Sequence, residues 1–140
     1  MLNGWAHCER WQQMARILIV EDEAPLRHIF VRNLERRGHR VIEAVSAAEA
    51  GTALRVEKEK CDLILLDINL PDATGWDVLR QLSTGARATH KVIIMTALRP
   101  AQSRLAAFRP DAVLLKPFPI EALLRLVERV LGQAGAESAP

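Results

Sequence analysis

Apolar residues recur along the chain in two alternating patterns, short continuous runs and longer stretches with helical spacing. Residues 16–20 read Arg-Ile-Leu-Ile-Val, an apolar, β-branched run typical of a strand buried on both faces. Pro25 then suits the first turn of a helix. Apolar residues at helical spacing come next: Leu26, Ile29, Phe30 and Leu34. The pattern therefore predicts a strand and then a helix.

The same alternation continues to about residue 131. It predicts further strands at residues 40–44, 62–67, 91–95 and 112–115. It also predicts helices at about residues 47–57, 76–82, 100–108 and 120–131. Local signals support these boundaries, because Gly38 suits a helix C-terminus and Ser46 with Glu49 forms a capping box. Residues 69–75 contain Pro71 and Gly75 and are predicted to be a loop.

Strands that alternate with helices favour a mostly parallel sheet covered by helices on both faces. Right-handed crossovers then favour a doubly wound, three-layer α/β sandwich, (βα)5, with a five-stranded sheet. We assign this domain to residues 15–131. Residues 132–140 are rich in small side chains and are expected to form a flexible tail.

Residues 1–14 lack this alternation and allow two interpretations. An extra helix is one, since four residues recur at about one helical turn: Leu2, Trp5, Cys8 and Trp11. An unstructured N-terminal extension is the other, and the ordinary domain start at residues 14–16 favours it slightly.

Composition narrows the class of protein. The chain has 140 residues, 49% of them hydrophobic, with a formal net charge of +2, which is too small to indicate nucleic acid or an anionic membrane as a partner. Cys8 and Cys61 suggest neither a disulfide framework nor a zinc site, and no secretory signal is apparent. No apolar run approaches the roughly 20 residues of a membrane span. We therefore expect a cytoplasmic protein without membrane insertion.

The residues that end the predicted strands carry the chemistry. In an open α/β sheet, ligands bind beyond the carboxyl ends of the strands. Here those ends hold carboxylates, a hydroxyl and an ammonium group: Glu21, Asp22, Asp67, Thr96 and Lys116. Clustered carboxylates repel one another unless a cation lies among them, and Mg²⁺ prefers such hard oxygen ligands. Asp67 ends the strand that is predicted to be the most buried, where a carboxylate can act as a nucleophile toward phosphorus. Lys116 and Thr96 would then stabilise the phosphoryl oxygens.

Four short motifs, in this order, carry a resemblance to a known family. They are residues 20–23 (Val-Glu-Asp-Glu), 66–72 with Gly75, 95–97 (Met-Thr-Ala) and 115–118 (Leu-Lys-Pro-Phe). Together they resemble the receiver domain of bacterial response regulators, from about residue 15 to residue 131. The resemblance implies a CheY-like fold with the flavodoxin-like strand order 2-1-3-4-5.

The resemblance also assigns roles. Asp67 is implied as the phosphoacceptor, and Asp22 and Asp67 as direct Mg²⁺ ligands together with the backbone carbonyl of Asn69. Glu21 is implied as an outer acid that reaches the metal through water.

Two more residues take their roles from the same resemblance. Thr96 corresponds to the switch hydroxyl, and Lys116 to the lysine that pairs with the phosphoryl group. The Lys116–Pro117 bond is expected to be cis, which would fix the direction of the lysine.

Two features depart from the family pattern, and a third residue, Leu98, lies at a position where family members differ. Val113 stands where the family usually has a switch aromatic, which puts coupling by a rotating ring in doubt. The stretch from Thr96 to Lys116 is slightly short and contains two prolines, so its helix is expected to be stunted or mobile. Leu98, two residues after the switch hydroxyl, cannot orient an attacking water, which predicts slow loss of the phosphoryl group.

The resemblance implies a signalling module and not a metabolic enzyme, one that catalyses only its own phosphorylation and dephosphorylation. The phosphoryl group would come from a sensor histidine kinase or a histidine phosphotransfer protein. Few residues follow Leu131, so output is expected through contacts with a downstream protein and not through DNA.

The same residues bear on three other functions. A phosphorylation-independent pseudo-receiver is kept open by Val113, although the complete acid set argues against it. A haloacid-dehalogenase-like hydrolase would need a second aspartate at the position of Asn69. Nucleotide binding has no P-loop or GxGxxG to support it.

We expect Trp76 to be a packing residue and Val31 to be exposed. The four histidines are expected on the surface: His7, His28, His39 and His90.

Overall fold

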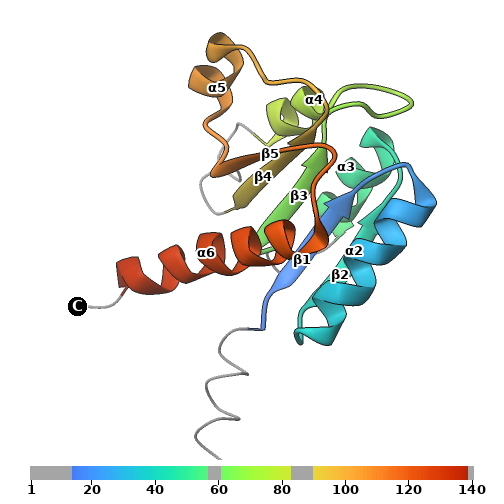
Figure 1. The fold of residues 1–140 in the computed structure, drawn as a ribbon. Coiled ribbons are helices and arrows are strands. Elements are labelled where there is room, and N and C mark those ends of the chain that lie inside the picture. Colours follow the sequence, from blue (N-terminus) through green and yellow to red (C-terminus); the bar gives the residue numbers. More distant parts are fainter. Residues whose placement is uncertain (1–13, 57–60, 83–89, 139–140) are drawn as a thin grey trace, which may run out of the picture.

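The computed structural model describes residues 14–56, 61–82 and 90–138, in which strands and helices alternate along the chain (Figure 1). The elements are β1 (Arg16–Val20), α2 (Ala24–Arg36), β2 (Arg40–Ala44), α3 (Ala47–Val56), β3 (Leu63–Asp67), α4 (Gly75–Gln81), β4 (Lys91–Thr96), α5 (Gln102–Phe108), β5 (Ala112–Leu115) and α6 (Ile120–Ser138). All strand pairs are parallel, and the sheet order is β2-β1-β3-β4-β5. The expected doubly wound sandwich and its strand order are confirmed.

Two apolar cores cover the two faces of the sheet. Successive strand residues point to opposite faces, so Ile17 and Ile19 pack with α2 and α6, whereas Leu18 and Val20 pack with α3 and α4. Figure 1 shows α2 and α6 in front of the sheet and α3 and α4 behind it. Every residue of the central strand β3 is buried, as its continuous apolar run predicts. No helix among the described residues is long and apolar enough to cross a membrane.

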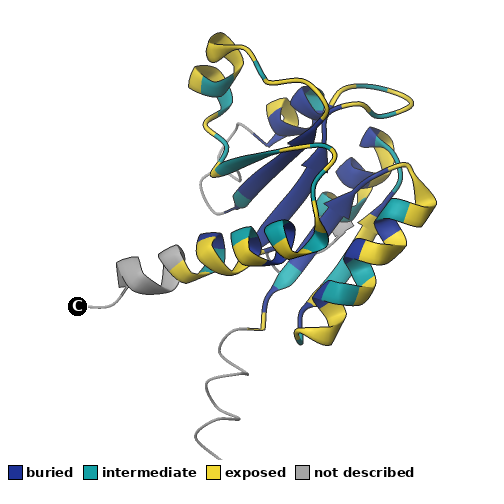
Figure 2. Ribbon diagram, in the orientation of Figure 1, coloured by how far each residue is buried: buried dark blue, intermediate teal, exposed yellow. Residues whose placement is uncertain are grey.

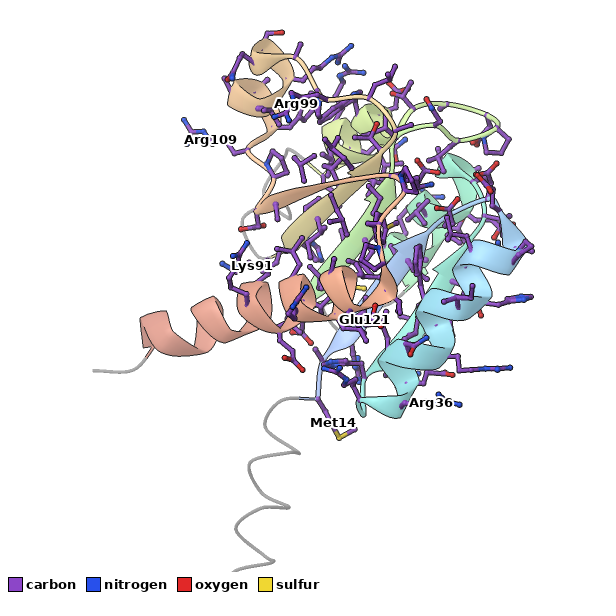
Figure 3. The ribbon with its side chains drawn as sticks, in the orientation of Figure 1. Met14, Arg36, Lys91, Arg99, Arg109 and Glu121 are labelled. Carbon is purple, nitrogen blue, oxygen red and sulfur yellow. The ribbon has the colours of Figure 1, made fainter. Side chains whose placement is uncertain are left out.

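The β5 edge of the sheet is covered less well. Neither β5 nor α5 contains a buried residue, and Leu115 is 38% exposed (Figure 2). Arg109, which follows α5, points away from the sheet (Figure 3). The Phe108 ring stacks on Trp76 of α4, with the ring centroids 5.3 Å apart. The short helix predicted between Thr96 and Lys116 is confirmed as α5. Trp76 is a packing residue, as predicted.

The buried face of α2 differs from the predicted one. Ile29 is 49% exposed, whereas Arg27 is buried beside Phe30 and Leu34. Val31 is half-buried against the same core, so its expected exposure was wrong. The buried residues Arg27, Phe30 and Leu34 are spaced i, i+3 and i+7, which is also a helical stripe. Periodicity alone could therefore not show whether Arg27 or Ile29 is buried.

Two of the four histidines are buried, contrary to the prediction. His39 and His90 are each 9% exposed, and the Nδ1 atom of His39 accepts a hydrogen bond from the Ala15 N–H at 3.2 Å. His28 is exposed as expected, and His7 lies outside the described residues. Burial lowers the pKa of His39 below its ordinary value, because the interior disfavours the charged imidazole.

Several helix ends follow the local signals. Gly38 has φ of +91°, as a helix C-terminus requires. The Ser46 hydroxyl accepts a hydrogen bond from the Glu49 N–H, but the Glu49 carboxylate accepts from Val45 and not from Ser46, so only half of the expected capping box forms. The full capping box lies at the start of α4, between Thr74 and Asp77.

The two ends of the domain were less predictable. Helix α6 continues to Ser138, past its predicted end at residue 131. Flexibility of residues 132–140 stays a prediction. Residues 1–13, for which the sequence allows either a helix or a leader, lie outside the described residues.

Candidate functional site

The carboxyl ends of the parallel strands gather the polar residues that the sequence singled out. Glu21 follows β1, Asp67 ends β3, Thr96 ends β4 and Lys116 follows β5. Register brings these ends together, because Val20 pairs with Leu66 across β1 and β3 while Asp67 pairs with Met95 across β3 and β4. Parallel strands place such residues on one edge of the sheet.

Lys116 contacts two carboxylates at once. Its Nζ atom lies 2.8 Å from Oε1 of Glu21 and 3.1 Å from Oδ2 of Asp67. The three side chains are 17%, 0% and 5% exposed, respectively, so this is a nearly buried cluster. The positive charge of Lys116 between the two carboxylates offsets the repulsion between them, which burial would otherwise strengthen.

Burial perturbs both groups of the Lys116–Glu21 pair. Burial, reinforced by the charge of Asp67, raises the pKa of Glu21 to about 7, although the hydrogen bond from Lys116 opposes the shift. Burial alone would lower the pKa of Lys116, but the hydrogen bond to Glu21 and the charge of Asp67 outweigh it and raise that pKa. The lysine is therefore held in its charged form.

Local backbone geometry fixes the remaining oxygens. The Asn69 N–H donates to Oδ1 of Asp67 at 3.1 Å, and the Glu23 N–H donates to Oε2 of Glu21 at 3.2 Å. The loop after Asp67 is closed by a bridge between Asn69 and Thr74. Both acids are thus oriented by residues two positions further along the chain.

The acids are suited to hold a divalent cation. Glu21, Asp22 and Asp67 each offer one carboxylate oxygen, and these atoms lie within 4.8 Å of one another. Glu21 and Asp67 are buried while Asp22 is exposed at the rim, so the group has access to solvent. Hard carboxylate oxygens at this spacing fit Mg²⁺, which is usually bound by one or two carboxylates with water and phosphate oxygens.

Thr96 is buried, but its hydroxyl is engaged within its own loop. It donates to the Leu98 carbonyl at 3.1 Å and accepts from the Leu98 N–H at 3.3 Å. Leu98 itself is 78% exposed. In this arrangement the hydroxyl is bound to the β4–α5 loop.

Val113 faces the core that lies between the sheet, α4 and α5. It is half-buried and packs in the same cluster as Trp76 and Phe108. The aromatic contact in this region is therefore the Trp76–Phe108 stack and not a ring on β5.

Two residues near the acids were missed by the sequence analysis. Arg27 is buried and donates through Nη1 to the Glu21 carbonyl at 2.9 Å, while its Nε donates to Oε1 of Glu43 on β2 at 2.9 Å. The spacing of Arg27 with Phe30 and Leu34 (i, i+3 and i+7) is compatible with burial, but the equally periodic stripe through Ile29 is too, so the sequence held no signal that selects the arginine.

Comparison with known proteins identifies a family. The sequence profile described as "Response regulator receiver domain" matches residues 17–128. The chain is 36% identical over 121 residues to the DNA-binding dual master transcriptional regulator RpaA of Synechocystis, covering 84% of this chain and 49% of that protein. It is also 36% identical over 121 residues to protein PilH of Pseudomonas aeruginosa, covering 84% of this chain and 98% of PilH. The chain thus spans about half the length of one relative and nearly all of the other.

A solved structure shows the same fold. The response regulator protein TrrA of Thermotoga maritima, in complex with Mg²⁺ and BeF, superposes with a TM-score of 0.71 and 27% identity. The match covers 84% of this chain and 99% of that one.

Proposed function

The chain belongs to the response regulator receiver domain family, and from this premise we propose that Asp67 accepts a phosphoryl group from a phosphohistidine of a partner protein. The single observation that carries the proposal is the contact of Lys116 with both Glu21 and Asp67 at the strand ends. This contact brings together the Asp67 carboxylate as the nucleophile, the Glu21 carboxylate and the positive charge of Lys116.

The transfer is a displacement at phosphorus. An Asp67 carboxylate oxygen forms the new O–P bond while the N–P bond of the phosphohistidine breaks, and the departing histidine nitrogen takes a proton from solvent water. Lys116 stays charged and stabilises the added negative charge. Thr96 exchanges its bond to Leu98 for one to a phosphoryl oxygen.

Mg²⁺ is the proposed cofactor. Asp22 and Asp67 would hold it directly with the backbone carbonyl of Asn69, and Glu21 would hold it through water. When bound, it neutralises charge on the phosphoryl oxygens during transfer. The oxygen spacing in this chain and the Mg²⁺ complex of TrrA support this assignment.

The proposed donor is a sensor histidine kinase or a histidine phosphotransfer protein, and the proposed output is a contact with a downstream protein. RpaA is described as DNA-binding, and this chain spans only about half of it. A contact with DNA is therefore not proposed for residues 15–131.

Intact mass after incubation with acetyl phosphate and Mg²⁺ tests the proposal. We expect one phosphoryl adduct on the unaltered chain and none on Asp67→Asn or in the presence of EDTA. Asp62→Asn is the matched control, because Asp62 lies at the other end of β3 and its Oδ2 accepts from the Arg16 N–H. This variant should still form the adduct.

Two results would contradict the proposal. An adduct that persists in Asp67→Asn would move the acceptor elsewhere. A folded chain that forms no adduct with acetyl phosphate or with any phosphorylated histidine protein would favour a phosphorylation-independent receiver.

A further inference from the structure

A buried arginine lies beneath the acidic loop that follows β1. Arg27 is 9% exposed and shares the core-facing side of α2 with Phe30 and Leu34. Burial of a guanidinium group is costly unless its donors are satisfied. Its partners therefore show what this position contributes.

Those partners are two backbone carbonyls and one carboxylate. Nη1 of Arg27 lies 2.9 Å from the carbonyl oxygen of Glu21 and 3.5 Å from that of Asp22. Nε donates to Oε1 of Glu43 at 2.9 Å. Glu43 pairs with Ile19 across β2 and β1, so it stands beside the strand that leads into the loop.

The two carbonyls belong to the peptide units on either side of the Asp22 Cα atom. Each peptide unit is planar, so holding both planes fixes the direction of the Cα–Cβ bond between them. Asp22 is exposed, so neighbouring side chains restrict its direction less than they would in the core. The Arg27 guanidinium can thus set the direction in which the Asp22 side chain leaves the loop.

Glu43 completes the arrangement. A guanidinium group is planar, and the Nε bond to Glu43 sets the plane from which Nη1 reaches the loop. The carboxylate of Glu43 also balances the positive charge, so that Arg27 adds little repulsion toward a cation held by the acids. A lysine could supply the positive charge but not the planar set of N–H donors that binds the carbonyls and Glu43 together.

We infer that Arg27, oriented by Glu43, is a positioning residue that pre-sets Asp22 for binding a divalent cation. The inference rests on the proposed function, since it concerns the cation that the acids would hold. It assigns a role in metal affinity to two residues that lie behind the acids.

Charge alone predicts the opposite effect, which makes the inference testable. Arg27→Met removes a positive charge near the acids, so Coulomb's law alone predicts tighter cation binding. Loss of positioning predicts weaker binding, by roughly tenfold, as is usual when a partner of a metal ligand is removed. Arg27→Lys keeps the positive charge and loses the planar set of N–H donors, so any weakening of cation binding in that variant comes from geometry.

The experiment measures Mn²⁺ affinity by water-proton relaxation on the full chain. Arg36→Met is the matched control, because Arg36 lies in the last turn of the same helix, away from the site (Figure 3). We expect both Arg27 variants to bind Mn²⁺ about tenfold more weakly and Arg36→Met to bind as the unaltered chain does. Circular dichroism and the thermal midpoint in EDTA establish that each variant is folded. Arg27→Lys alone decides the matter if Arg27→Met does not fold.

A second readout separates positioning from general damage. Phosphorylation of the Arg27 variants by acetyl phosphate should recover at high Mg²⁺, since only the affinity for the cation is reduced. Folded Arg27→Lys that binds Mn²⁺ as tightly as the unaltered chain would overturn the inference. Absence of Mn²⁺ binding by the unaltered chain would instead overturn the metal site of the proposed function.

Discussion

Lys116 and Glu21 form an ion pair inside the acidic site, with 2.8 Å between Nζ and Oε1 and with the Glu21 side chain fully buried. Burial and the charge of Asp67 raise the pKa of Glu21 to about 7, despite the hydrogen bond from Lys116. Near neutral pH, Glu21 therefore exchanges a proton, and any cation that needs its charged form competes with that proton.

Cation affinity should accordingly increase with pH. Between about pH 6 and about pH 8 we expect Mn²⁺ to bind progressively more tightly, because Glu21 loses its proton in this range. Glu21→Gln should bind more weakly and show a flatter pH dependence, whereas Glu23→Gln, a change in the exposed acid two residues further on, should retain the dependence. Relaxation titrations at three pH values measure this, and an unchanged slope in Glu21→Gln would assign the proton to another group.

His39 should make the folded chain sensitive to acid. Its pKa in the folded chain is below the ordinary 6.5, so the unfolded chain binds the proton more readily. The His39 contribution to the free energy of unfolding is complete above about pH 6.5 and decreases as the pH falls through and below that value. His39→Asn keeps an acceptor for the Ala15 N–H and removes the titration, so it should lose less stability between about pH 7 and about pH 5.

Urea unfolding at each pH measures the difference between the variant and the unaltered chain. This comparison also cancels the opposite contribution of Glu21, whose raised pKa lowers stability as the pH rises from 4.5 to about 7. His28→Asn is the control, because His28 is exposed. Parallel curves for His39→Asn and the unaltered chain would contradict the prediction.

Gly75 should not tolerate a side chain. A Cβ atom at this position would lie 2.6 Å from the Asp67 carbonyl oxygen, which is backbone and cannot move aside easily. We expect Gly75→Ala to lower the free energy of unfolding by about 1–3 kcal/mol and to slow phosphorylation of Asp67. Gly132→Ala meets no atom within 4 Å and should stabilise α6 by about 0.5–1 kcal/mol. Chemical denaturation compares the two, and equal effects would refute the steric argument.

Phe108 should anchor α5 to the domain. Its ring stacks on Trp76, and α5 has no buried residue of its own. Phe108→Leu should cost about 1–2 kcal/mol and should accelerate hydrogen exchange in α5. Phe118→Leu removes a comparable half-buried ring, one that stacks on Phe30 at 5.6 Å on the other face of the sheet. This control should leave exchange in α5 unchanged, and acceleration in both variants would indicate general destabilisation.

Leu98 should make the aspartyl phosphate long-lived. It is exposed in the β4–α5 loop, where its backbone binds the Thr96 hydroxyl, and its apolar side chain cannot orient a water for attack on phosphorus. Leu98→Glu should shorten the lifetime by about tenfold, which corresponds to about 1.4 kcal/mol of activation free energy. Decay of the intact-mass adduct after removal of acetyl phosphate measures it. Ile29→Glu, a change at an exposed apolar residue on α2, should have no such effect, and a lifetime unchanged in Leu98→Glu would contradict the proposal.

Much of this structure was accessible from the sequence. The apolar run of β3, the glycine after α2 and the alternation of strands with helices each report local geometry, which neighbouring residues determine. The acids could be predicted to meet because parallel strands share one carboxyl edge, whatever the details of packing. The strand order required the family resemblance as well.

The sequence alone could not show which of two equally periodic faces of a helix is buried. Arg27 and Ile29 both fit a helical stripe on α2, and only the sheet beneath it, with Glu43 and the Glu21 carbonyl in reach, makes the arginine the buried one. His39 is buried where the Ala15 N–H, just before β1, donates to its Nδ1 atom, a contact between residues far apart in the sequence.

The sequence by itself therefore determined which elements form, their order and the set of groups at the strand ends. The tertiary structure decided which of those groups touch: Lys116 with Glu21 and Asp67, and Thr96 with Leu98. The physical reason is distance along the chain. Periodicity and capping depend on residues a few positions apart, whereas burial, ion pairs and pKa shifts depend on partners that only folding brings together.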